Sequence, residues 1–565
     1  MPAAPGAPRL SSPRLWQAAS GVIALLVLSP LVALAFAAAQ GGNDPWQHLV
    51  TYVLPPAARD TILLLGGVAL LTGAVGAGTA WLVTAYDFPG RRVLDWALLL
   101  PLAVPTYIVA YAYLDVLHPV GPVQSAIRAL LGFESPRDLR LPDVRSMAGC
   151  IFVIGFVLYP YVYLTTRAMF LMQSANVIEA ARTLGAGRLA VFWRVALPLA
   201  RPAMAVGISL VLMEALNDIG ASEFLGVRTM TVSIYTTWIT RSDLPGAAQI
   251  ALAMLALVVG IVLLERWARR QRRYAHDAQH PRPLVPHRLR GARAAAAIAV
   301  LLLPIGVGFL IPAAYLVDAA ASRIRFAGLA PALAREALNT ISLSLIATAL
   351  TVVAGVVVIY AVRVRQTRGA AAFARAASLG YAVPGTVLAI GMLPVVTGID
   401  RMLNVLTVSL FNASVGLLVL GSGAALIYAY YVRFLAVAAG GVEAGFSRIS
   451  PSLDDAARTL GETAGRRLWR IHLPLSRPAL ATAALLVFVD CMKELPATLL
   501  LRPLGYETLA THLYGEAIRG TYEDGAIAAL LIVLVGLVPV MLLARLSRAG
   551  QPGHADAEIP VSWVR

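Results

Sequence analysis

Residues 179–204 read EAARTLGAGRLAVFWRVALPLARPAM, and residues 455–480 read DAARTLGETAGRRLWRIHLPLSRPAL. The two stretches are separated by close to half of the 565-residue chain, and 14 of their 26 aligned positions are identical. Each copy places an acidic residue and two alanines ahead of a glycine, and each continues to a Leu-Pro and an Arg-Pro pair. The step from position 179 to position 455, called the repeat offset below, indicates an internal duplication.

The duplication extends beyond this motif. An Asp-Thr pair at position 60 matches an Asn-Thr pair at position 339, and Val-Pro at position 104 matches Val-Pro at position 383. These two matches share one offset, which is slightly longer than the repeat offset. Because matched segments occur in matched order, we predict two sequence halves with the same elements in the same sequence.

The composition indicates a membrane protein. Only 13% of the residues are charged, against about 25% in an average soluble domain, and the mean hydropathy is +0.74. Helices are the expected spanning form, because an open strand leaves backbone groups unpaired in lipid. Segments long enough to cross a bilayer are predicted at 16–39, 61–86, 96–117, 147–172, 201–223, 247–267, 294–320, 339–362, 374–398, 414–439, 477–500 and 525–546.

The net charge of +16 is interpreted as a topology signal rather than a nucleic-acid surface. The arginines cluster in loops between apolar segments, above all in the linker, and the positive-inside rule places such loops in the cytoplasm. With twelve spans both termini are then cytoplasmic. Cys150 and Cys491 lie in apolar segments and predict neither a disulfide framework nor a thiolate metal site.

These features predict a domain organisation with about six spans in each half, in the same orientation. Parallel repeats of this kind place a substrate path at their interface. His276, His280 and His287 in the linker are interpreted as solvated residues rather than metal ligands. The predicted parts are a first half at 1–267 with a cytoplasmic loop at 173–200, a basic linker at 268–293, a second half at 294–546 with a loop at 441–476, and a cytoplasmic tail at 547–565.

The repeated element itself predicts a short helix, a turn and a second short helix beside the membrane. Gly185 and Gly187 are expected to cap the first helix, and a new segment is expected to start at Pro198. Small alanines permit close approach of a partner surface. The alternative is an amphipathic helix that only anchors the loop in the interface. Two copies at equivalent positions favour docking of a two-fold partner.

Ionisable residues also occur within the predicted spans that follow each element. Glu214 aligns with Asp490, and Asp218 aligns with Glu494, both at the repeat offset. Such residues are costly in a membrane and face a cavity or a partner, so one hypothesis is that they line a cation path. The other is that they form internal salt bridges, as Lys493 would with Asp490 or Glu494. Both hypotheses remain open for Glu214 and Asp218, and salt bridges are favoured for the second copy.

The E-A-A, Gly and Leu-Pro pattern resembles the cytoplasmic loop of permease subunits in bacterial ATP-binding-cassette importers. The resemblance covers nearly the whole chain and implies an all-α fused permease with two six-helix repeats in the inner membrane. It also implies that each loop forms a coupling helix on one of two ATPase subunits. The copies differ, since Asp455 replaces the usual glutamate. The implied docking residues are Glu179, Ala180, Ala181, Gly185, Asp455, Ala456, Ala457 and Gly461.

The segments at 214–238 and 493–514 resemble those of fused permeases for ferric iron. That resemblance implies a periplasmic binding protein that delivers Fe(III), and carboxylate oxygens suit such a hard cation. Similar fused permeases serve thiamine and other small solutes. The translocation-path candidates are Glu214, Asp218, Asp490, Lys493 and Glu494.

The chain has no Gly-x-x-x-x-Gly-Lys-[Ser/Thr] phosphate loop, and its one lysine is Lys493. We therefore expect no bound cofactor and no enzymatic activity here, with ATP and magnesium on a separate subunit. An ion-coupled secondary transporter is the second hypothesis, but it gives no reason for the duplicated loop. A membrane enzyme using Glu214, Asp218 or His472 ranks last.

Overall fold

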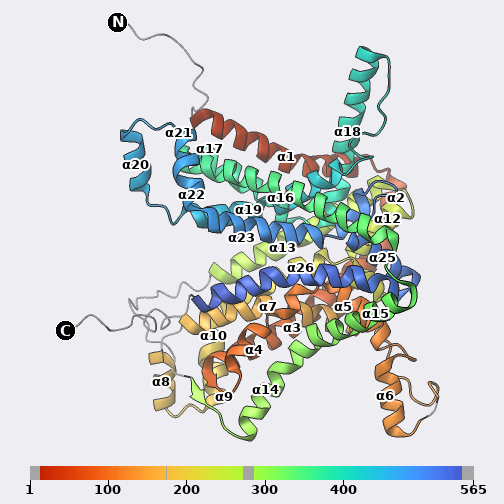
Figure 1. Ribbon diagram of the computed structural model, residues 1–565, viewed down its shortest axis with the longest axis vertical. Helices are drawn as coiled ribbons and strands as arrows, with labels where there is room; N and C mark the ends of the chain where they lie inside the picture. The colour runs from red at the N-terminus through yellow and green to blue at the C-terminus, as the bar shows by residue number, and fades with distance from the viewer. Residues whose placement is uncertain (1–12, 134, 173–174, 271–285, 550–565) are drawn as a thin grey trace. The chain divides into compact units, whose positions relative to one another are not determined.

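The computed structural model describes residues 13–133, 135–172, 175–270 and 286–549 (Figure 1). Within these residues the chain is almost entirely helical. Two two-residue strands, β1 (Tyr86–Asp87) and β2 (His287–Arg288), pair in parallel. Ten helices are long and apolar enough to cross a membrane, or up to twelve if two bent helix pairs each count as one span. The predicted all-α membrane fold is confirmed.

Several predicted spans have different ends in the structure. The segment predicted at 201–223 ends earlier, because its helix stops at Asn217 and a short helix follows. The segment predicted at 477–500 likewise stops at Met492. The segment predicted at 374–398 is divided, since one α-helix ends at Ala377, a short 3-10 helix follows, and the next α-helix begins at Gly385, directly after Pro384. Of the predicted linker histidines, His276 and His280 lie outside the described residues.

The chain forms two compact units, and each unit draws on both sequence halves. Unit 1 comprises residues 1–56, 230–258 and 329–512, and unit 2 comprises residues 57–229, 259–328 and 513–565. The unit boundaries therefore differ from the predicted halves, 1–267 and 294–546, which describe the sequence repeat.

Unit 1 is built around α16 and α19, which pack on each other and on α23. Glycines allow this close approach: a Cβ added at Gly441 would lie 2.4 Å from the Cβ of Ala483. Small residues commonly let membrane helices approach closely. The elements are α1 (Pro13–Ala39), α2 (Asn43–His48), η1 (Leu49–Val53), α12 (Met230–Ile239), α13 (Leu244–Arg270, to Val258 in this unit), α16 (Pro331–Arg365), α17 (Arg368–Ala377), η5 (Leu379–Ala382), α18 (Gly385–Phe411), α19 (Ala424–Phe446), α20 (Pro451–Thr459), α21 (Ala464–Arg467), η6 (Leu468–His472), α22 (Leu473–Leu475), α23 (Arg477–Met492), α24 (Pro496–Leu501) and the start of α25 (Leu509–Arg519).

Unit 2 is built around α7 and α10, which pack closely on each other. A Cβ added at Gly207 would lie 2.8 Å from the Cα of Val162, so the backbones nearly touch there. The elements are most of α3 (Leu54–Ala85), β1, α4 (Arg91–Ala97), η2 (Leu100–Ala103), α5 (Thr106–Val116), α6 (Pro122–Leu131), α7 (Met147–Met172), α8 (Ala175–Thr183), α9 (Arg188–Val191), η3 (Phe192–Ala196), α10 (Leu197–Asn217), α11 (Gly220–Phe224), β2, α14 (Ala292–Ile305), η4 (Gly306–Leu310), α15 (Ile311–Ala327) and α26 (Tyr522–Ala549).

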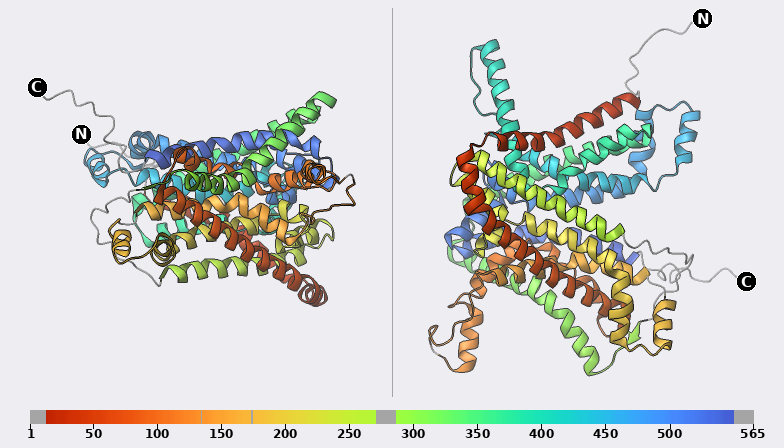
Figure 2. Two further views of the ribbon diagram at one scale, coloured as in Figure 1. Left: turned by 90° about the horizontal axis from the view of Figure 1, so that it is seen from below. Right: turned by 180° about the vertical axis from the view of Figure 1, so that it is seen from behind.

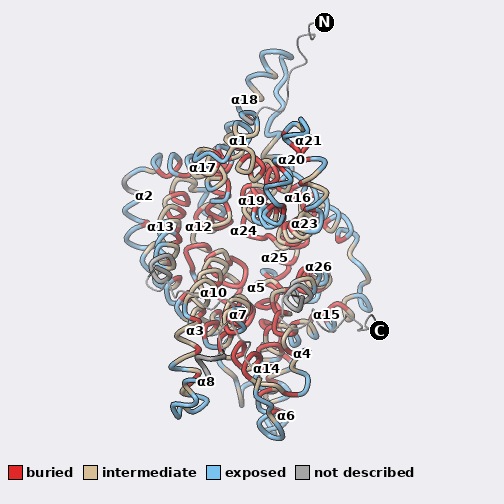
Figure 3. Tube along the Cα trace, turned by 90° about the vertical axis from the view of Figure 1, so that its left-hand side faces the viewer, coloured by how far each residue is buried: buried red, intermediate tan, exposed pale blue. Residues whose placement is uncertain are grey.

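The two sequence halves exchange their first helices. Helix α1, the start of the first half, packs on α16, α17 and α18 from the second half. The equivalent helices α14 and α15, which start the second half, pack on α4 and α5 from the first. Figure 2 gives two further views of these elements. Figure 3 shows buried residues within each unit, whereas α6 and α20 are largely exposed.

Candidate functional site

The first loop element (residues 175–196) begins with α8, which ends in a glycine cap. Gly185 has a φ of +86°, a left-handed conformation that favours glycine. Its N–H donates to the carbonyl of Arg182 at 3.0 Å, and the N–H of Ala186 donates to the carbonyl of Ala181 at 3.0 Å. This pair of bonds is a Schellman motif, and it fixes the direction in which the chain leaves the helix.

The second loop element (residues 451–475) repeats this geometry with different neighbours. Gly461 has a φ of +79°. Its N–H donates to the carbonyl of Arg458 at 3.0 Å, and the N–H of Glu462 donates to that of Ala457 at 2.9 Å. The turn conformation is thus shared even where Glu462 replaces Ala186. The predicted role of Gly185 as a cap agrees with its conformation, whereas Gly187 precedes α9 as its N-cap.

The predicted docking residues divide into outward and inward positions. In the first element Glu179 and Ala180 are exposed, and Ala181 is half-buried against the apolar core. In the second, Asp455 and Ala456 are exposed and Ala457 is buried. Each element therefore presents a carboxylate and one alanine, while the second alanine anchors the helix to its unit.

Two further pairs of exposed residues belong to the same loop elements and were missed by the sequence reasoning. Leu184 and its equivalent Leu460 are both exposed. Trp193 is 58% exposed, and its equivalent Trp469 is 73% exposed. Both pairs are related by the repeat offset, which was the available signal. Tryptophan is enriched among the residues that contribute most to protein–protein binding.

A buried ionic network supports the second element. Asp454, which is buried, accepts a hydrogen bond of 2.8 Å from Nε of Arg363 in α16. Arg363 also donates to the carbonyls of Phe446 and Ile449, at 2.6 and 2.8 Å. Arg467 approaches the same carboxylate at 3.5 Å. The network joins α16, the end of α19 and the loop element into one assembly.

Two aromatic rings pack against His472, the remaining member of this network. His472 is fully buried, with Nε2 3.3 Å from the Asp454 carboxylate. Its ring packs against Tyr360 and Phe446, at centroid distances of 5.3 and 5.2 Å. The Tyr360 hydroxyl donates to the carbonyl of Ala464. These contacts give His472 a structural setting rather than a catalytic one.

An apolar cluster takes the place of this network under the first element. Val191 and Ala196, which align with Arg467 and His472, are both buried. Trp81 packs on Phe170 and Phe192, at ring-centroid distances of 5.3 and 5.6 Å. The two elements therefore share a turn and an exposed face but rest on different chemistry.

The elements also join their next spans differently. In the first, Arg188 to Asn217 form one continuous 30-residue helix. Helix α10 begins at Leu197, next to the segment start predicted at Pro198, but it is not a separate helix, because the π-helix Phe192–Ala196 joins it to α9 without a break. In the second, the helices on either side of Ser476 meet at 78°.

Asp218 caps the break that ends α10. It is buried, accepts a hydrogen bond from the Thr106 hydroxyl, and accepts one of 3.0 Å from the N–H of Ser222 in α11. The carboxylate thereby satisfies a donor at the start of α11. Glu214 lies one turn earlier on α10 and is half-buried.

Glu494 has the equivalent role at the end of α23. Its two oxygens accept the N–H groups of Ala497 and Thr498 at 3.0 Å each, and the Thr498 hydroxyl at 2.7 Å. Arg433 on α19 lies 3.5 Å away. Lys493 pairs with Asp490 at 2.8 Å, so of the two salt bridges considered for this lysine the structure contains the one to Asp490.

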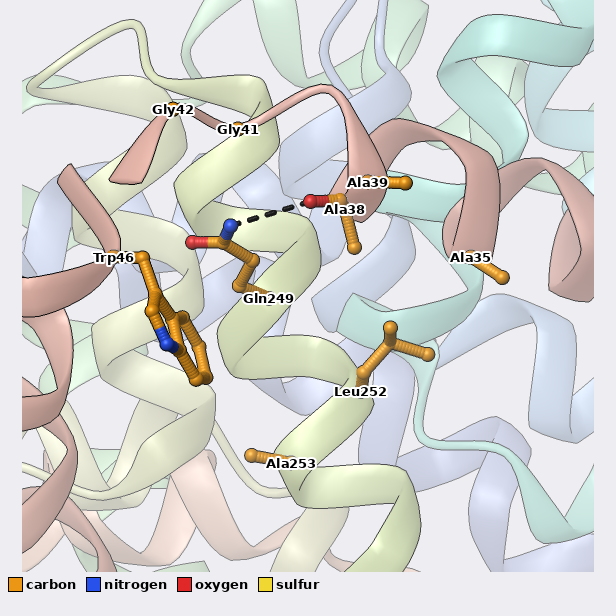
Figure 4. A pocket seen from close by; sticks show the side chains of 9 residues that line it. All are labelled: Ala35, Ala38, Ala39, Gly41, Gly42, Trp46, Gln249, Leu252 and Ala253. Carbon is orange, nitrogen blue, oxygen red and sulfur yellow. Dashed lines mark hydrogen bonds between the residues drawn. The ribbon is translucent and has the colours of Figure 1, made fainter. Parts of the chain in front are cut away.

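A separate crevice in unit 1 is lined by none of these carboxylates (Figure 4). It has a volume of about 630 Å³ between the end of α1 and α13. Most of its lining is alanine and glycine, with Trp46 and Leu252. The Gln249 amide crosses it and donates to the carbonyl of Ala38 at 3.2 Å. Within the described residues no three His, Cys, Asp or Glu side chains gather to hold a metal.

The long apolar helices, the repeated halves and the paired loop elements define a multi-pass membrane transport subunit. The chain belongs to the family of binding-protein-dependent transport system inner membrane components, whose model matches it twice, at residues 69–274 and 351–550. It is therefore an ATP-binding-cassette importer permease with both copies of the family domain in one polypeptide.

Curated relatives differ in how much of the chain they cover. The Fe(3+)-transport system permease protein FbpB 2 of Haemophilus influenzae is 24% identical over 493 residues, which cover 86% of this chain and 89% of the relative. The sulfate transport system permease protein CysT of Salmonella typhimurium is 29% identical over 244 residues, 41% of this chain and 83% of the relative. The molybdenum transport system permease protein ModB of Escherichia coli is 30% identical over 197 residues, 34% and 82% respectively.

Proposed function

We propose that this permease imports Fe³⁺ that a periplasmic binding protein delivers. Two copies of a separate ATPase subunit bind the two loop elements, which act as coupling helices on the cytoplasmic side. Both chain termini lie on that side. ATP binding closes the ATPase dimer, and the coupling helices carry this motion into the spanning helices.

The observation that carries the proposal is the matched pair of exposed faces. Each consists of an acidic residue, an outward alanine, a leucine and a tryptophan around a glycine turn of the same geometry. A two-fold symmetric partner needs two surfaces of one kind, and an ATPase dimer provides such a partner. The absence of a phosphate-loop sequence from this chain supports placing ATP hydrolysis on that partner.

The charge of the spans that follow the elements supports a cationic cargo. Residues 210–226 and 486–502 carry Glu214, Asp218, Glu223, Asp490 and Glu494 against Lys493 and Arg502. Asp218 and Glu494 are held as helix caps and Asp490 is paired with Lys493. We assign Glu214 to the path because it is half-buried one turn before the break in α10, where an ionisable residue inside a membrane span marks a candidate pathway. Hard cations favour carboxylate oxygen.

The share of the chain that each relative matches supports iron as the cargo. The ferric iron permease matches over most of both chains, whereas the sulfate and molybdenum permeases match less than half of this chain. Import of such an oxyanion is the second candidate, favoured by the higher identity of those shorter matches. Thiamine is the third cargo to test.

Reconstitution tests both parts of the proposal. The full chain is placed in liposomes with or without its ATPase subunit, and uptake of labelled Fe³⁺, molybdate, sulfate and thiamine is measured with the cognate binding protein. We expect ATP-dependent uptake of Fe³⁺ alone. Uptake without the ATPase would overturn the coupling role, and uptake of an oxyanion or thiamine in place of iron would overturn the cargo.

A further inference from the structure

Each unit carries a hairpin that leaves it at the end opposite its loop element. The first hairpin (residues 117–133 and 135–146) contains α6 and belongs to unit 2. The second hairpin (residues 400–422) contains the end of α18 and belongs to unit 1. Figures 1 and 2 show both helices running crosswise to the spanning helices of their own units.

The first hairpin is polar inside and apolar outside. Gln124 is buried, and its amide donates to the carbonyl of Leu117 at 2.8 Å and accepts the N–H of Leu141 at 3.2 Å. Arg128, also buried, donates to Ser125 at 3.1 Å. The outward residues are Val120, Leu130 (85% exposed), Leu131 and Phe133.

The second hairpin has the same inverted pattern. Asp400 is buried and accepts the N–H groups of Val419 and Leu420 at 2.7 and 3.0 Å. Asn404 donates to the carbonyl of Gly416 at 2.7 Å. The outward residues are Met402, Val405, Leu406, Val408, Leu410, Phe411 (75% exposed), Val415, Leu417 and Leu418.

The closing side chains are equivalent in the repeat. Gln124 is related to Asp400, and Arg128 to Asn404, by the same repeat offset that relates the loop elements. In each hairpin a polar side chain on the helix, Gln124 or Asp400, binds the backbone of the returning segment. This hydrogen bond between the helix and the returning segment is therefore present in both hairpins, although the residues that form it differ.

The inverted pattern indicates what surrounds the hairpins. A loop in water tends to bury its apolar side chains. In these hairpins the apolar side chains are exposed instead, and the buried polar side chains hold the helix and the returning segment together. A helix that lies across the spanning helices, with an apolar outer face and basic flanks, fits the boundary between lipid headgroups and acyl chains. Among the described residues of the two hairpins, the exposed charged side chains are Arg137, Arg140, Arg145 and Arg401, which outnumber Asp138 and Asp143.

Continuity with the lipid-facing surface favours lipid over a protein partner. Helix α18 packs directly on α1, a candidate span whose Val32 and Phe36 are exposed. The apolar face of the second hairpin therefore continues from a helix whose outer side is already solvated by lipid. We propose that both hairpins lie in the outer leaflet of the membrane, at the boundary between lipid headgroups and acyl chains, on the side opposite the coupling helices.

Site-specific quenching tests this placement. Leu130→Cys and Phe411→Cys are made in the full chain with both native cysteines, which are buried, replaced by alanine. Each variant is labelled with an environment-sensitive fluorophore in nanodiscs containing phosphatidylcholine with a nitroxide near the top of the acyl chain. Arg140→Cys is the matched control on the basic flank, and Asp455→Cys on the exposed loop element is the aqueous reference.

We expect the labels at Leu130 and Phe411 to be quenched roughly threefold more than the label at Asp455, because an interfacial helix buries its apolar face among acyl chains. The label at Arg140 should show intermediate quenching. Quenching equal to that at Asp455 would overturn the proposal. So would shielding that arises only when the periplasmic binding protein is added, since that result assigns the faces to protein docking.

Discussion

The carboxylate of Asp454 lies 2.8 Å from Nε of Arg363, a residue 91 positions earlier in the chain. This contact ties the second loop element to α16, a helix that also packs on α1 and α19. Beneath the first loop element, the aromatic rings of Trp81, Phe170 and Phe192 pack together instead. The two elements are therefore joined to their units through different contacts.

Asp454→Ala is expected to destabilise the permease, because it leaves the half-buried Arg363 and the buried Arg467 without their carboxylate. Removing one partner of a buried pair costs about 3–5 kcal/mol. The midpoint of thermal unfolding in detergent measures the effect. Asp455→Ala is the matched control, since its side chain is 71% exposed, and it should leave the midpoint unchanged. Equal midpoints for the two variants would contradict the supporting role of the network.

Gly185→Val and Gly461→Val are expected to weaken coupling between ATP hydrolysis and uptake. A valine in the left-handed conformation costs on the order of 1–2 kcal/mol, so the helix end and the following turn must shift. Gly187→Ala and Gly465→Ala are controls, because nothing lies within 4 Å of a Cβ at either position and neither has a positive φ. The measured quantity is the ratio of ATP hydrolysed to solute imported. A ratio unchanged from that of the controls would remove the glycine turns from the coupling mechanism.

Trp193→Ala and Trp469→Ala are expected to weaken assembly with the ATPase subunits. Truncating a tryptophan at the centre of an interface costs about 2 kcal/mol or more, which corresponds to roughly thirtyfold in affinity. Phe326→Ala is the control, since Phe326 is exposed but lies on α15 outside both elements. Affinity is measured by titrating the ATPase onto permease in nanodiscs. Binding as tight as that of the control would place the docking surface elsewhere.

Glu214→Gln and Asp218→Ala are expected to impair the permease in different ways. Asp218 caps α11, so its change should lower the unfolding midpoint, with a cost of about 1 kcal/mol for a weakened cap. Glu214 is assigned to the path, so its change should reduce uptake while the midpoint stays at the wild-type value. Unfolding and uptake are measured on the same preparations. Normal uptake by Glu214→Gln would exclude it from the path.

Much of the architecture was predictable because its causes are local in the sequence. Apolar segments of bilayer length predict the spans, and the constant offset between matched motifs predicts the repeat. The glycine turns followed from the left-handed conformation that Gly185 and Gly461 adopt without strain. Leu184, Trp193 and their equivalents could also have been found, since they have the same offset.

Other features depended on contacts between distant segments. The residues of α1 show no preference for either half, because its apolar face fits any apolar partner, and only the folded chain places it on α16 and α18. The roles of Asp218 and Glu494 as helix caps could likewise not be predicted from the sequence. A carboxylate in an apolar segment looks the same whether it binds cargo or caps a helix, and the break after Asn217 and that after Met492 appear only in the structure.

The doubled motif by itself determined that this protein has two equivalent loop elements, because closely similar local sequence builds the same turn. The tertiary structure decided that they rest on different supports. Arg363 is far in sequence from Asp454 and His472, and packing within one unit brings the three side chains together. Val191 and Ala196 occupy the positions equivalent to Arg467 and His472 in the other unit without any charge. A turn depends on its local sequence, whereas the residues that pack against each other in the interior depend on the whole fold.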